Sequence, residues 1–119
     1  MYDQLIYNIA RSSGFPDNFA RLLVAQCKHE SANYTSNVFK LNNNLNGYKF
    51  VGQKIAKKGT LSPEGDYYAK YTKVDDSVKE LINWIKRRQL EKKFPADLST
   101  INSPAKYAEL LKSAGYYGD

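Results

Sequence analysis

The chain has 119 residues and a formal net charge of +6, with a single cysteine and ten tyrosines. This length suits one domain with its own core, and one cysteine excludes an internal disulfide framework. No apolar run approaches the roughly 20 residues that a membrane helix needs, so we expect no membrane span. The positive charge favours anionic partners such as nucleic acid, acidic membrane surfaces or anionic cell-wall polymers.

An apolar helical repeat predicts a short helix over residues 2–12 and, after a Ser-Ser-Gly break, a second helix from about 16 to 30. The buried face of the second helix begins apolar and ends polar, with Phe19, Leu22, Leu23, Gln26, Cys27 and Glu30 in order. A carboxylate is therefore expected at the end of an otherwise apolar stripe.

Asparagine and glycine interrupt the helical pattern after the second helix, with one helical turn expected over 36–41. Two strands are predicted over 48–55 and 67–74, joined by a loop over 57–65 that is rich in glycine and proline. The sequence thus predicts a small β-hairpin lobe.

Two further helices complete the pattern. Asp75-Asp76-Ser77 is predicted to cap a third long helix that reaches about residue 90. Ser103 and Pro104 open a last helix over 105–114, and Gly115 ends it. We therefore predict one mainly α (α+β) domain over 1–119, with the hairpin lobe inserted between the second and third long helices.

Glu30 is the strongest catalytic candidate from residue chemistry alone. Its place on the buried face predicts partial desolvation, and the C-terminal end of a helix disfavours negative charge. Both effects favour a protonated carboxyl near neutral pH, which a general acid requires. The alternative is a helix-terminal glutamate that points into water, and from position alone that is the commoner case.

Other reactive side chains show no comparable pattern. His29 points in a different direction from Cys27 and no HExxH spacing occurs, so we predict neither a metal site nor a cofactor. Cys27 is predicted to be a small core residue. Basic residues cluster at 54–58 and 86–93 without a nucleic-acid-binding motif, so no nucleic-acid partner is expected.

Four segments occur in an order that resembles one enzyme family. The first, "AQCKHES", has the pattern A-Q-x-x-x-E-S, and the second, after Ser36, is "NNLNGYK", with N-N-L-x-G-x-K. The others are "AKYTKVDDSVKELINWI" and "YAELLKSAGYYGD", whose pattern is Y-A-x-x-L-x-x-A-G-Y. Together they resemble the glucosaminidase domain of the glycoside hydrolase 73 type, in the lysozyme-like superfamily. Ala32 replaces a frequent glycine of that family, and Asn46 stands where an aromatic residue is common.

This resemblance implies a lysozyme-like fold that cleaves β-1,4 bonds after N-acetylglucosamine in bacterial peptidoglycan. It implies Glu30 as the catalytic acid, with Tyr116 beside it. The residues implied to shape the cleft and bind substrate are Ser31, Asn43, Asn44, Leu45, Gly47 and Tyr48. The second catalytic group is open: Glu64 is slightly preferred over Asp66, and the N-acetyl group of the substrate is a third option.

The sequence therefore predicts a monomeric endo-β-N-acetylglucosaminidase that acts on peptidoglycan. A lytic transglycosylase or muramidase is the close alternative, and a non-catalytic glycan-binding or phage structural module is the alternative from another class. With this substrate we expect an extracellular or cell-wall-associated protein. Because no secretion leader is visible, we expect it to act in a phage virion or as a module of a secreted parent.

Overall fold

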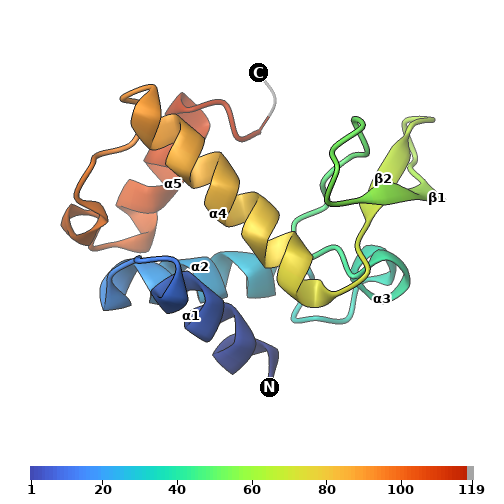
Figure 1. Cartoon of the computed structure of the whole chain (residues 1–119), viewed down its shortest axis with the longest axis horizontal. Coiled ribbons are helices and arrows are strands. Elements are labelled where there is room, and N and C mark those ends of the chain that lie inside the picture. Colours follow the sequence, from blue (N-terminus) through green and yellow to red (C-terminus); the bar gives the residue numbers. More distant parts are fainter. Residues whose placement is uncertain (118–119) are drawn as a thin grey trace.

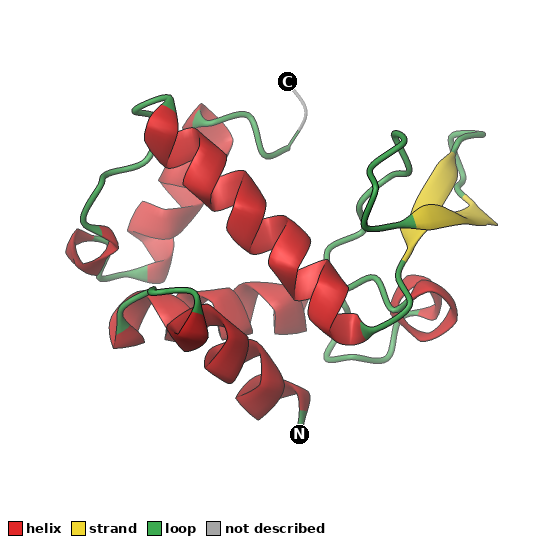
Figure 2. Cartoon of the chain, viewed as in Figure 1, coloured by secondary structure: helices red, strands yellow, loops and turns green. Residues whose placement is uncertain are grey.

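The computed structural model describes residues 1–117, with a helical lobe and a smaller hairpin lobe (Figure 1). The helices are α1 (Tyr2–Ser12), α2 (Asp17–Glu30), α3 (Asn37–Asn42), α4 (Val74–Leu90) and α5 (Pro104–Ser113), with a 3-10 turn, η1, at Leu98–Thr100. Strands β1 (Lys57–Leu61) and β2 (Tyr67–Lys70) pair antiparallel (Figure 2). The predicted mainly α, lysozyme-like fold is confirmed.

One apolar core holds the helical lobe together. The fully buried members include Ile6 and Ala10 of α1, Phe19, Leu23 and Cys27 of α2, and Val78, Leu81 and Ile85 of α4. These positions recur every three or four residues, so each helix buries one face. Helix α4 contacts α1 and runs from the hairpin lobe toward α5, which makes it the element that both lobes share (Figure 1).

Both predicted capping sequences lie at helix starts, but they act differently. Ser103 accepts a hydrogen bond from the Lys106 amide and caps α5 as predicted. Helix α4 begins earlier than predicted, with Asp75 and Asp76 in its first turn, where negative charge stabilises the helix dipole. Ser77 is buried and accepts a hydrogen bond from the backbone amide of Leu45 at 2.9 Å, so it attaches the preceding loop instead of capping the helix.

The predicted strand over 48–55 and loop over 57–65 are wrong. Strand β1 is Lys57–Leu61, whereas Lys49 forms only a single bridge to Tyr68. Gly59 gives the physical reason: a Cβ atom there would lie 2.2 Å from the side-chain oxygen of Asn42. The glycine that looks like a loop residue is therefore what lets β1 pack against α3.

A left-handed turn follows directly on α2. Ala32, Asn33 and Tyr34 have φ values of 51°, 57° and 65°. Each non-glycine residue in this conformation costs about 1–2 kcal/mol. The Ser31 hydroxyl offsets part of this cost, because it donates to the Cys27 carbonyl at 2.7 Å and accepts from the Tyr34 amide at 3.0 Å. The turn ends α2 at Glu30.

Replacing Ala32 by glycine should raise the free energy of unfolding by about 0.5–1 kcal/mol, because relief of the left-handed strain exceeds the extra entropy of the unfolded chain. The Ala32 side chain is exposed, so little packing is lost. Urea denaturation followed by circular dichroism measures the change. The exposed Ala25 in the middle of α2 is the matched control, and Ala25→Gly should lose about 1 kcal/mol. Equal losses in both variants would contradict strain at position 32.

Candidate active site

Glu30 is the last residue of α2, and its side chain is exposed. The prediction of a desolvated carboxyl is therefore wrong for the free chain, because the buried face of α2 ends one turn earlier, at Gln26 and Cys27. Within residues 1–117, Glu30 forms no ion pair with any basic side chain. Its carboxylate is thus free to meet a ligand.

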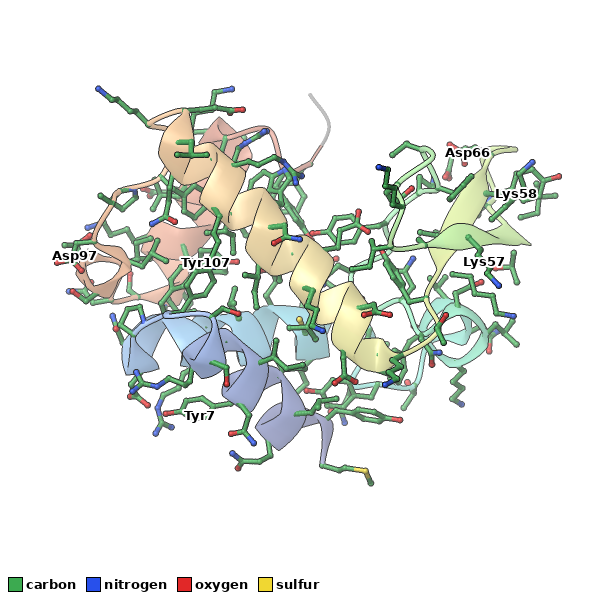
Figure 3. The ribbon with its side chains drawn as sticks, in the orientation of Figure 1. Tyr7, Lys57, Lys58, Asp66, Asp97 and Tyr107 are labelled. Atoms are coloured by element: carbon green, nitrogen blue, oxygen red, sulfur yellow. The ribbon has the colours of Figure 1, made fainter. Side chains whose placement is uncertain are left out.

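A groove between α2 and α5 begins at Glu30 and has a volume of about 220 Å³. We call it the α2–α5 groove. Its walls are Leu22, Ala25, Gln26, His29 and Glu30 on one side, with Pro104, Tyr107, Ala108, Leu111 and Tyr117 on the other. Figure 3 shows Tyr107 in the space between these two helices.

A buried polar cluster surrounds the last turn of α2. The Tyr107 hydroxyl donates to Gln26 Oε1, and Asn46 Nδ2 donates to Cys27 Sγ at 3.6 Å. Four buried atoms around this turn have no hydrogen-bond partner among residues 1–117: Gln26 Nε2, Asn46 Oδ1, Tyr48 Oη and Tyr116 Oη. Unpaired buried polar groups cost about 1–3 kcal/mol each, so native proteins keep them for a specific reason, a catalytic role among them.

Tyr116 connects this cluster to Glu30. Its ring packs edge-to-face on Trp84 at 5.1 Å, on Tyr117 at 5.3 Å and on Tyr48 at 6.1 Å. Burial raises the pKa of Tyr116, and the nearby Glu30 carboxylate raises it further. The pKa of Tyr117 is raised by the same two causes. Both hydroxyls therefore stay protonated at neutral pH, within the electrostatic reach of Glu30.

Asn44 holds the loop around Tyr48 from inside the protein. Its Nδ2 donates to the carbonyls of Tyr48 and Ala69, at 2.9 Å each, and its Oδ1 accepts from the Tyr48 amide at 3.1 Å. Only 1% of Asn44 is exposed. Because its amide is fully hydrogen-bonded within the fold, Asn44 fixes the loop and has no group left for a sugar.

The residues implied to bind substrate divide into two sets. Ser31, Asn44 and Leu45 are buried, and Asn43, Gly47 and Tyr48 keep some exposed surface. Direct contact with a sugar does not fit the first set, because at most 1% of each of these residues reaches the surface. They support the site from within.

Glu64 and Asp66, the candidates for a second carboxylate, lie at the turn between β1 and β2. Both pair with Lys49 Nζ, at 2.6 Å and 3.1 Å. A hydrogen bond from Ser62, together with Lys49, lowers the pKa of Asp66. Neither carboxylate forms a hydrogen bond or ion pair with the described residues of α2, and Figure 3 shows Asp66 on the hairpin lobe.

The sequence analysis did not predict three features near the site: Trp84, Tyr117 and the pairing of Gln26 with Tyr107. Gln26 carried a usable signal, since it is a polar residue inside the apolar stripe of α2. Its partner Tyr107 lies 81 positions away, and no local pattern predicts such a pairing.

One of the comparisons with known proteins found a match. A model of the Glucosaminidase family, described as mannosyl-glycoprotein endo-beta-N-acetylglucosaminidase, matches residues 5–119. The chain belongs to this family. Searches of curated proteins and of solved structures found no match. The family implies a glycoside hydrolase, and a peptidoglycan substrate fits it. Each helix within residues 1–117 is too short or too polar to cross a membrane.

Asn44→Ala should lower the free energy of unfolding by about 1–3 kcal/mol, because it removes three hydrogen bonds to the backbone and leaves the Tyr48 amide without its partner. Asn37→Ala is the matched control, since Asn37 is exposed at the start of α3. Urea denaturation measures both variants. Equal stability of the two would contradict the structural role of Asn44.

The Cys27 thiol should not react with thiol reagents while the chain is folded. Its side chain is 0% exposed, and burial raises its pKa to about 12. At about pH 8 almost no thiolate is present, and the reagent has no access to it. A colorimetric disulfide-exchange assay should show reaction only after unfolding in urea. Equal rates in the folded and unfolded chain would rule out this burial.

Proposed function

We propose that this chain hydrolyses the β-1,4 bond after N-acetylglucosamine in peptidoglycan, with Glu30 as the general acid. The position of Glu30 carries this proposal: the carboxylate ends a rigid helix, lacks a basic partner among residues 1–117, and stands beside a groove and two protonated tyrosines. Family membership supports the reaction class. The net charge of +6 suits an enzyme held at an anionic cell wall, outside the cytoplasm or in a phage virion.

The first step is proton transfer from Glu30 to the oxygen of the leaving sugar as the glycosidic bond breaks. Glu30 is exposed in the free chain, so a bound glycan must cover it before it can act as a proton donor in a dry site. Removal of water disfavours the charged carboxylate, and the adjacent C-terminal end of α2 acts in the same direction. Substrate binding thus gives Glu30 the dry surroundings that a general acid needs.

The second group is best supplied by the substrate itself. Its acetamido oxygen would attack the anomeric carbon as the leaving oxygen takes the Glu30 proton. Water would then add to the anomeric carbon and open the cyclic intermediate, and its proton would return to Glu30. The observation that favours this route is that Glu64 and Asp66 pair with Lys49 on the hairpin lobe and form no hydrogen bond or ion pair with the described residues of α2.

Glu30→Gln should reduce the release of soluble glycan from purified peptidoglycan by about 10²–10⁴-fold, the usual contribution of a general acid. Glu109→Gln, an exposed glutamate of α5 outside the groove, should retain full activity. Unchanged circular dichroism shows that both variants fold. The acid assignment fails if Glu30→Gln digests peptidoglycan as fast as wild type.

The products of the same digestion separate the alternatives. Mass spectrometry should find one added water per cleavage and N-acetylglucosamine at the new reducing end. Anhydro ends would indicate a transglycosylase, and N-acetylmuramic acid at the reducing end would indicate a muramidase. Binding to cell walls without any soluble product would indicate a non-catalytic module.

Full activity of Glu64→Gln and Asp66→Asn would support the acetamido route, and loss of activity in either would contradict it.

A further inference from the structure

We infer that the hairpin lobe is a docking surface for an anionic cell-wall polymer that carries a phosphodiester in every repeat. The lobe comprises residues 37–73, from the start of α3 to the residue before α4. Its docking lysines lie outside the candidate active site, so the surface goes beyond the proposed hydrolysis and does not depend on Glu30.

Nearly all of the net charge is on the hairpin lobe. Residues 37–73 contain seven lysines, no arginine and two acidic residues, a net charge of +5 out of the +6 of the whole chain. The rest of the chain is therefore close to neutral. A charge concentrated on one lobe creates a local positive potential, which attracts an anionic polymer and turns the lobe toward it.

Most of these lysines have no acidic partner. Glu64 and Asp66, the two acidic residues of the lobe, both pair with Lys49. All the other lysines of the lobe are exposed and form no ion pair within residues 1–117: Lys40, Lys54, Lys57, Lys58, Lys70 and Lys73. Their ammonium groups are thus free to meet the anionic groups of a ligand.

Two of the lysines face each other across the hairpin. Lys57 of β1 and Lys70 of β2 are register partners, so their side chains leave the same face of the sheet. Like charges at directly opposite positions destabilise a strand pair. A phosphate placed between the two ammonium groups would replace this repulsion with two attractions. The hairpin thus offers a position where an anion relieves an unfavourable contact.

The lysines lie on both faces of the two-stranded ribbon. Successive side chains of a strand point to opposite faces, so Lys58 leaves the face opposite to that of Lys57 and Lys70. Figure 3 shows Lys57 and Lys58 at the outer end of the hairpin lobe. A flat membrane would contact one face of the ribbon, whereas a flexible polymer can follow both. This arrangement favours the polymer.

The tyrosine rings of β2 are already covered by lysine. Lys58 Nζ lies 4.7 Å from the centre of the Tyr67 ring, and Lys49 Nζ lies 5.4 Å from that of Tyr68. Proteins that bind single-stranded nucleic acid stack bases on such rings, and here ammonium groups occupy them. Lysine also meets phosphate as a point charge, without the bidentate geometry of arginine. The surface therefore suits a polyol phosphate chain that has no bases.

The test measures binding of a synthetic glycerol phosphate polymer to the full chain by calorimetry at several salt concentrations. Glutamine at positions 57, 58 and 70 together should weaken binding by about tenfold or more, because three phosphate contacts are lost. The slope of log affinity against log salt should fall by about 2, since each contact with a flexible strand contributes about 0.7. Arginine at the same three positions keeps the charge and should keep the affinity.

The matched control removes the same charge from the helical lobe. Lys86→Gln, Lys106→Gln and Lys112→Gln together alter exposed positions of α4 and α5. Both triple variants have a formal net charge of +3, so total charge cannot explain a difference between them. The control should keep the affinity and the salt slope of the wild type, and circular dichroism shows that both variants fold.

Equal weakening in the two triple variants would overturn the docking surface, because binding would then follow total charge. Absence of binding by the wild type at low salt would overturn it as well. Tighter binding to phosphatidylglycerol vesicles, or to single-stranded DNA with the same number of phosphates, would overturn the assignment to a wall polymer. Glu30→Gln should bind the polymer like wild type, so failure of the proposed hydrolysis and failure of the docking surface are separate results.

Discussion

Three consecutive asparagines hold the segments of the hairpin lobe together, and the hairpin side of the candidate site depends on them. Asn42 donates to the Thr60 hydroxyl at 2.9 Å and accepts from the Thr60 amide at 3.1 Å, which attaches β1 to α3. Asn43 ends α3 in the left-handed conformation and donates to the Tyr71 carbonyl at 2.9 Å. Asn44 then holds the loop that follows. Each of the three side-chain amides thus hydrogen-bonds the backbone of a neighbouring segment.

This attachment reaches the catalytic candidate through aromatic rings. Asn44 sets the backbone of Tyr48, whose ring lies against Tyr116, and Tyr116 packs on Trp84 of α4. The other side of the site is set by the end of α2 and by the strained turn after Glu30. Glu30 thus stands where two independently supported parts of the chain meet.

The sequence predicted the features that local pattern controls and missed those that tertiary packing decides. Helical periodicity gave all four long helices, and the Ser103 cap of α5 is local as well. The strand near 48–55 was misplaced because the fit of Gly59 against Asn42 joins segments that no local pattern relates. For the same reason Asn43 and Asn44 looked like ligands for sugar, although Asn44 is buried. Residue chemistry made Glu30 the candidate acid and the family resemblance strengthened that prediction, whereas its exposure came only from the structure.

The most direct test of Glu30 as the general acid is a crystal structure of the Glu30→Gln variant with a bound N-acetylglucosamine oligosaccharide. We predict that the side-chain amide at position 30 lies about 2.6–3.2 Å from a glycosidic oxygen, the distance that proton transfer requires. An oligosaccharide bound with every glycosidic oxygen out of reach of position 30 would contradict the central claim.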